Sequence, residues 1–188
     1  MRLEELLGEI EDAVREKMKD RYAEEELSEE TVKTVALAAI KYGDLSNQAR
    51  KDYNFDIDRF ASFEGNTGPY LLYNIVRIKS ILEKAGDCGN AASFEDLPLE
   101  APGMRALLLK LAAFPDVIRD AGQELAPHKI CQFAHELSDA FSSFYHDTPI
   151  LKEPDAKKRE SMISLLRLIL GLLETSIDIL GFSAPDKM

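Results

Sequence analysis

The sequence predicts an all-α protein, a bundle of amphipathic helices packed around one core. Over most of the 188 residues, apolar side chains recur at spacings of three and four, the period of a helix with one buried face. No segment shows the strict alternation of a half-buried strand, and no strand–helix–strand alternation is visible. The length fits one ordinary domain, or a main domain with a small appended element.

Two helices are expected near the N-terminus. The first covers residues 3–18, where six apolar side chains form one stripe. Ser28 marks the start of the second, because its hydroxyl can accept from a free backbone N–H, and Glu29 and Glu30 then lie at the positive end of the helix dipole. The apolar period continues, and this second helix runs into residues 41–43.

Residues 53–70 show no clean period and are expected to form an ordered loop packed by its own aromatic side chains. The loop ends in turn-forming residues. Thr67 or Gly68 can cap a helix whose first turn contains Pro69, and this helix is expected to continue to Lys84.

Residues 86–103 are polar and punctuated by glycine and proline, so they are expected to form an internal linker. Two short helices and a longer one that opens at Pro127 should follow. The last helix opens at Pro154 and presents a wide apolar face before Gly181 stops it. The expected ranges are 104–113, 115–125, 127–145 and 154–180.

The formal charge of −11 argues against a broad, sequence-independent coat on nucleic acid. Residues 1–30 hold 12 acids and 5 bases, a balance of −7, so the other 158 residues carry only −4. The acidic region is either a solvated helix face or a docking tail. Cys88 and Cys131 make neither a disulfide framework nor a metal set, and no apolar run is long enough to span a membrane, so a cytoplasmic protein is expected.

Motifs of the common enzyme classes are absent, because the sequence contains no GxSxG, HExxH, P-loop or GxGxxG pattern. His128 and His135 lie seven residues apart on one helix face, with Asp139 four residues further, so they could form a metal pair. In the alternative, His135 pairs with Asp139 at the surface. The sequence therefore assigns no catalytic residue and no metal site.

A candidate binding surface lies at the turn before residue 70 and on the helix after it. Two glycines and Asn66 allow a tight turn and leave backbone polar groups open to a ligand. Tyr73 and Arg77 stand one helical turn apart, and an aromatic ring beside a guanidinium can stack an unpaired base and meet its phosphate or polar edge. In the alternative, Tyr73 packs in the core and Arg77 is an ordinary surface residue.

Residues 35–46 read VALAAIKYGDLS and residues 55–77 read FDIDRFASFEGNTGPYLLYNIVR. These runs strongly resemble the C-terminal part of class I arginyl-tRNA synthetases. The resemblance covers about residues 28–188 and implies the helical bundle of the class Ia anticodon-binding domain, often called the DALR domain. Residues 1–27 are similar to the acidic helix that follows the family's catalytic signature loop. Shorter similar segments lie at 114–115, 124–128, 144–151 and 180–188.

The resemblance implies that this chain holds the anticodon arm of arginine tRNA. Loop 62–68 is similar to an Ω-shaped loop that meets the arm, and the following helix carries a tyrosine and an arginine that match residues contacting anticodon nucleotides. A later aromatic and the terminal methionine match further parts of that pocket. The implied contacts are Asn66, Tyr73, Arg77, Tyr145 and Met188, with Lys79 as a candidate phosphate contact.

The same resemblance implies a parent enzyme that joins arginine to its tRNA with ATP. This chain has no HIGH or KMSKS motif, so it is expected to begin just beyond the catalytic domain and to be inactive alone. ATP with magnesium and arginine are expected only in that domain. The chain is expected to be a monomer and to contain no cofactor. It is expected to bind arginine tRNA and the catalytic domain, and to bind neither DNA nor a membrane. The alternative is a stand-alone helical protein-interaction module that kept the fold and lost RNA recognition.

Overall fold

The computed structural model describes residues 3–19, 28–86, 94–101 and 103–188. These parts of the chain contain helices and turns and no strand, which confirms the predicted all-α class. The helices are α1 (Leu3–Lys19), α2 (Glu29–Leu45), α3 (Ile57–Phe60), α4 (Gly68–Ala85), α5 (Met104–Ala112), α6 (Phe114–Glu124), α7 (Pro127–Asp147) and α8 (Ala156–Ile179), and the 3-10 helix η2 (Ile150–Lys152) precedes α8.

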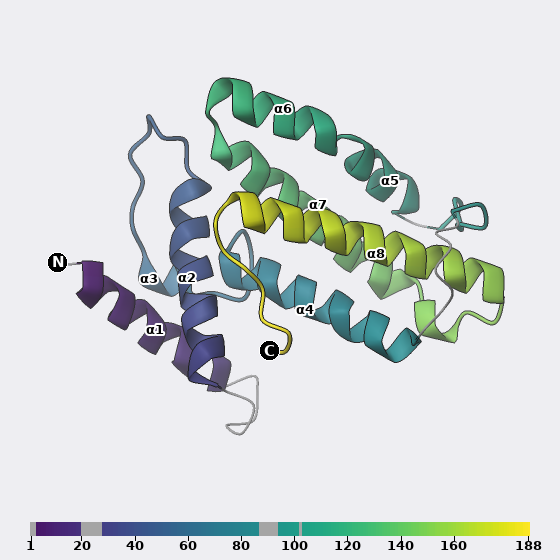
Figure 1. Ribbon diagram of the computed structural model, residues 1–188, viewed down its shortest axis with the longest axis horizontal. Coiled ribbons are helices and arrows are strands. Elements are labelled where there is room, and N and C mark those ends of the chain that lie inside the picture. Colours follow the sequence, from purple (N-terminus) through teal and green to yellow (C-terminus); the bar gives the residue numbers. More distant parts are fainter. Residues whose placement is uncertain (1–2, 20–27, 87–93, 102) are drawn as a thin grey trace.

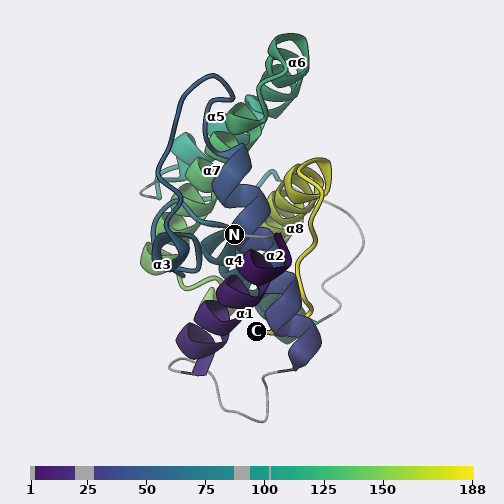
Figure 2. The same ribbon diagram turned by 90° about the vertical axis from the view of Figure 1, so that its left-hand side faces the viewer.

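Three long helices, α4, α7 and α8, pack side by side and form the body of the bundle (Figure 1). Helices α5 and α6 pack against α7, and α2 packs against α4 and α7 at the other end. The short helix α3 and the N-terminal α1 lie against α2 (Figure 2). After α8 the chain turns back, and residues 180–188 run past α4 (Figure 1).

One hydrophobic core joins these helices. Ile10, Val14 and Met18 of α1 are buried in the same cluster as the apolar faces of α2, α4, α7 and α8. The expected α1 stripe is therefore buried along its C-terminal half, whereas Leu3 at its start is 67% exposed. Residues 20–27, which complete the predicted N-terminal unit, lie outside the described residues.

The helix ends follow the local signals in the sequence. The Ser28 hydroxyl accepts from the Thr31 backbone N–H at 3.0 Å, and α2 begins one residue later. Gly181 has a φ of +82° and ends α8, as its position predicts. Two short elements, α3 and η2, are not visible in the apolar period, because four and three residues are too few to show one.

Helix α2 continues through Gly43 to Leu45, beyond its expected range. A Cβ atom at Gly43 would lie 2.5 Å from the ring of Phe60, so this glycine marks a close approach of α3 rather than a helix end.

The predicted linker 86–103 begins as expected, since α4 ends at Gly86 with a φ of +68°. Residues 94–101 form turns before α5 begins at Met104. Residues 87–93, which include Cys88, and residue 102 lie outside the described part of the chain. Among the described helices, none combines the length and the apolar character that crossing a membrane requires.

Candidate nucleic-acid interface

Helix α4 carries three of the six predicted contact residues, Tyr73, Arg77 and Lys79, and its N-terminus is fixed against α2. Thr67 caps it by accepting from the Tyr70 N–H at 3.2 Å and by donating to the Ser62 carbonyl at 2.5 Å. A Cβ atom at Gly68 would lie 2.6 Å from the carbonyl carbon of Ala38. Only glycine allows the two backbones to approach this closely, so the start of α4 has a defined position in the bundle.

The outer side of α4 is a strip of partly exposed side chains between α7 and the C-terminal segment. It contains Tyr73, Val76, Arg77, Lys79 and Ser80, while Leu71, Leu72, Ile75 and Ile78 of the same helix are buried. Tyr73 also packs against the core with part of its ring. The Tyr73 ring is therefore partly packed against the core and partly accessible to a ligand.

Arg77 and Tyr145 form one unit across the α4–α7 boundary. The Arg77 guanidinium carbon lies 4.5 Å from the centre of the Tyr145 ring, within the range of a cation–π contact. Phe141 supports that ring from one helical turn away, at a centroid distance of 5.9 Å. A guanidinium in such a contact keeps its five N–H donors for hydrogen bonds, because the ring interacts with its charge.

Polar side chains hold α4 and α7 together next to this unit. Asn74 is fully buried, and its amide donates to the Tyr70 carbonyl at 3.0 Å and accepts from the Ser142 hydroxyl at 2.9 Å. The Tyr70 hydroxyl donates to Asp139 at 2.7 Å, and burial together with this carboxylate raises the pKa of Tyr70. These contacts fix the register of the two helices and with it the position of Arg77 over Tyr145.

The histidine pattern follows the surface-pair alternative. His135 Nε2 lies 3.4 Å from Asp139 Oδ2, and the His135 ring meets the Tyr70 ring edge-on at 5.7 Å. His128 lies in the first turn of α7, seven residues before His135. The described residues contain no group of three or more potential ligands that could hold a metal ion.

The C-terminal segment makes the second wall of the strip. A groove of about 400 Å³ lies between α4 and this segment and is lined by Val76, Lys79, Ser80 and Met188, among others. Lys79 Nζ lies 3.1 Å from Glu174 and 3.8 Å from Asp186. The candidate phosphate contact thus already faces two carboxylates, and a phosphate would have to compete with the exposed Asp186.

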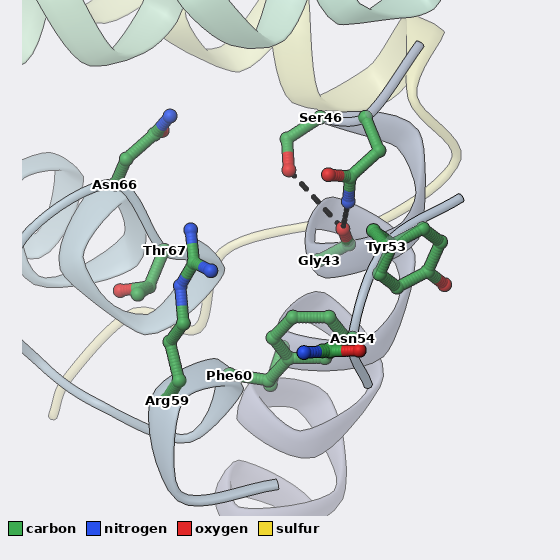
Figure 3. A pocket seen from close by; sticks show the side chains of 10 residues that line it. Gly43, Ser46, Tyr53, Asn54, Arg59, Phe60, Asn66 and Thr67 are labelled. Carbon is green, nitrogen blue, oxygen red and sulfur yellow. Dashed lines mark hydrogen bonds between the residues drawn. The ribbon is translucent and has the colours of Figure 1, made fainter. Parts of the chain in front are cut away.

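Asn66 lies apart from the strip, in the loop before α4. The buried Tyr42 hydroxyl lies 2.5 Å from Asn66 Oδ1 and 2.9 Å from the Cys131 carbonyl oxygen, so one phenol proton joins the loop to α7. Burial raises the pKa of Tyr42 far above its ordinary value. A small cavity of about 10 Å³ beside Asn66 has room for little more than a water molecule. Figure 3 shows Arg59 extending past Thr67 into this space.

The structure thus brings five of the six predicted residues to the strip on α4 or its edges, with Arg77 next to Tyr145 and Lys79 in one groove with Met188. Tyr73 lies on the same face, and Asn66 belongs to the neighbouring loop. Sequence reasoning missed Glu174 and Asp186 beside Lys79, because they come from α8 and from the C-terminal segment. It also missed Val76, whose spacing is that of an ordinary surface position on α4.

The sequence of this chain is similar to those of known proteins. Residues 71–188 match a protein family described as the DALR anticodon binding domain. The whole chain is 54% identical to part of an arginine–tRNA ligase from Agathobacter rectalis and 47% identical to part of one from Alkaliphilus oremlandii. These alignments cover 33% and 32% of the two relatives, so the chain spans about a third of their length.

Solved structures give the same result for the fold. The chain superposes on an arginyl-tRNA synthetase from Thermus thermophilus with a TM-score of 0.90 at 32% identity, covering 100% of this chain and 32% of that one. An arginyl-tRNA synthetase from Plasmodium falciparum gives a TM-score of 0.83 at 26% identity, covering 100% and 34% respectively.

Proposed function

Because the chain belongs to the DALR anticodon-binding domain family, we propose that it binds the anticodon arm of arginine tRNA as the RNA-binding portion of an arginine–tRNA ligase. The observation that carries the proposal is the Arg77–Tyr145 unit beside Tyr73, on a strip that falls inside the matched region. An unpaired base needs an aromatic surface for its face and donors for its phosphate or polar edge. This strip offers both.

Recognition would divide among the strip residues. Tyr73 supplies a ring on which a splayed anticodon base can stack, and Arg77 supplies N–H donors while its contact with Tyr145 holds the guanidinium in place. Met188 contributes apolar surface in the adjoining groove. Asn66 contacts the arm from the loop before α4, and Lys79 meets a phosphate after releasing Asp186.

The remaining steps of the reaction belong to the rest of the parent enzyme. In this proposal, ATP with magnesium and arginine bind in a catalytic domain outside this chain. The chain itself holds no cofactor and works in the cytoplasm as a monomer, next to that domain. The chain positions the tRNA and performs no chemical step. The net charge of −11 fits a small base-reading site better than a wide phosphate-binding field.

Two substitutions test the proposal. Tyr73→Ala and Arg77→Ala should each weaken arginine tRNA binding by about 1–3 kcal/mol, the cost of one lost stacking or base contact. Arg105→Ala is the matched control, because this exposed arginine lies on α5, away from the strip. Fluorescence anisotropy with labelled tRNA measures all three affinities.

The stand-alone interaction module predicts another result. In that case neither Tyr73→Ala nor Arg77→Ala would change tRNA binding relative to the Arg105→Ala control. Such equality would remove the RNA-binding role and leave only the fold.

A further inference from the structure

A second cleft lies at the far end of α7 from the Arg77–Tyr145 unit. The turn after α2 and the turn between α6 and α7 come together there, as both ribbon views show (Figures 1 and 2). The cleft has a volume of about 310 Å³, and its polar lining includes Gln48, Arg50, Glu124 and His128. It therefore has room for a phosphate group and the sugar attached to it.

Its charge favours an anion. Arg50 has no acidic partner among the residues that the structure describes, although the chain as a whole carries −11. The carboxylate of Glu124 is paired with Lys129 at 2.5 Å, so it offers little opposition to a second negative group. The Gln48 amide and the His128 ring add further hydrogen-bonding groups to the lining.

Leu125 lines the cleft and has an unusual backbone conformation. It is 84% exposed, and it is the one non-glycine position in the described part of the chain with a positive φ, at +50°. A left-handed backbone is unfavourable for leucine because its Cβ atom crowds the following carbonyl oxygen, and an exposed side chain recovers none of this cost by burial. An apolar side chain next to an anion site suits a ribose or base attached to a bound phosphate.

Helix α7 connects this cleft to the strip. His128, His135, Asp139 and Ser142 follow at spacings of seven, four and three, so they share one face of α7. That face meets α4 at Tyr70 and Asn74 and ends beside Tyr145. Pro127 and Tyr145 are about 27 Å apart along the helix axis, a span that one folded RNA can bridge.

We propose that the cleft formed by Gln48, Arg50, Leu125 and His128 binds a backbone phosphate of the same tRNA, at a point outside the anticodon loop. The proposal rests on the function proposed above and adds a sequence-independent contact to it. The strip selects bases, and the cleft fixes the direction in which the arm leaves it.

The test compares two RNAs and three variants. The RNAs are whole arginine tRNA and a hairpin that contains only its anticodon loop and the two adjoining base pairs. The Arg50→Gln variant loses one phosphate contact, so it should bind tRNA about five- to eightfold more weakly than the unaltered chain at 0.1 M salt. The slope of log affinity against log salt concentration should fall by about 0.7–0.9, and the two proteins should bind equally near 1 M salt. Hairpin binding should not change. Arg50→Lys should retain most of the affinity, and Arg105→Gln controls for general loss of charge.

The outcomes separate the two proposals. If Tyr73→Ala weakens binding of both RNAs while Arg50→Gln weakens neither, the cleft is not an RNA site and the proposal for it is overturned. Equal loss for Arg50→Gln and Arg105→Gln, or a loss on the short hairpin, also overturns the cleft. Absence of tRNA binding by the unaltered chain overturns both proposals.

Leu125→Gly gives an independent check. Glycine tolerates the left-handed backbone, so this variant should unfold at a higher urea concentration and still bind whole tRNA more weakly. A purely structural Leu125 would give higher stability with unchanged affinity, and that result would remove it from the site.

Discussion

Replacing Gly68 by alanine should loosen the contact on which the position of α4 depends. The added Cβ atom would lie 2.6 Å from the carbonyl carbon of Ala38 and 3.0 Å from the Ala39 nitrogen, and closer still to the Ala38 carbonyl oxygen. Ordinary contact distances are 3.4–4 Å. Since every one of these neighbours is backbone, no side chain can swing away, and α2 and α4 must separate.

The cost follows from overpacking. Forcing a methyl group into such a contact costs about 1–3 kcal/mol, of which at most about 1 kcal/mol returns as the better helix propensity of alanine. A net loss of about 1–2 kcal/mol lowers the urea midpoint by about 0.5–1 M for a denaturant slope near 2 kcal/mol/M. Binding of tRNA should weaken as well, because Tyr73 and Arg77 move with the helix.

Gly171→Ala is the matched control. Gly171 lies inside α8, and an added Cβ atom would meet nothing within 4 Å. This variant should gain up to about 1 kcal/mol from helix propensity alone. Urea unfolding followed by circular dichroism compares the two. A Gly68→Ala variant as stable as Gly171→Ala would refute the close approach of α2 and α4.

Three further changes test local contacts in the same unfolding assay. Thr67→Ala should lower the free energy of unfolding by about 1 kcal/mol, because α4 loses its cap, and Thr67→Ser should keep most of that stability. Equal stability of the natural chain and both variants would contradict the cap. Tyr42→Phe should cost about 0.5–1.5 kcal/mol, because it removes the hydroxyl bond that joins α7 to the loop before α4, although the Cys131 carbonyl keeps its place in the hydrogen-bond ladder of α7; no loss would mean that this hydroxyl bond is not formed. Lys110 holds the pKa of Glu136 below its ordinary value of 4.5, so the pair stabilises the fold above that pH and the contribution disappears as the pH falls through the lowered value. The difference in urea midpoint between the natural chain and Lys110→Met should therefore shrink on acidification, and a constant difference would argue against the pair.

Local signals in the sequence were sufficient for the ends of several helices. Ser28 and Thr67 cap helices because a hydroxyl near the first turn satisfies a free N–H whatever the rest of the chain does. Gly43 misled the same reasoning, since a glycine there serves a close approach by Phe60 rather than a turn. That distinction depends on a residue 17 positions away, which no local pattern contains.

The residues of the candidate site also differ in whether the sequence alone could bring them together. Tyr73 and Arg77 share a face by helical spacing alone, so the sequence placed them together. Tyr145 is 68 residues from Arg77, and only the family resemblance indicated that the two belong to one site. The pairing of Lys79 with Asp186 could not be predicted, because it depends on the path that the C-terminal segment takes past α4.

The most direct test of the proposed function is a titration of the unaltered chain with arginine tRNA and with the same tRNA carrying a changed anticodon. If the strip reads anticodon bases, changing one contacted base should weaken binding by about 1–3 kcal/mol, or roughly 5- to 150-fold, at constant salt. Equal affinity for the two tRNAs would contradict anticodon recognition by this chain.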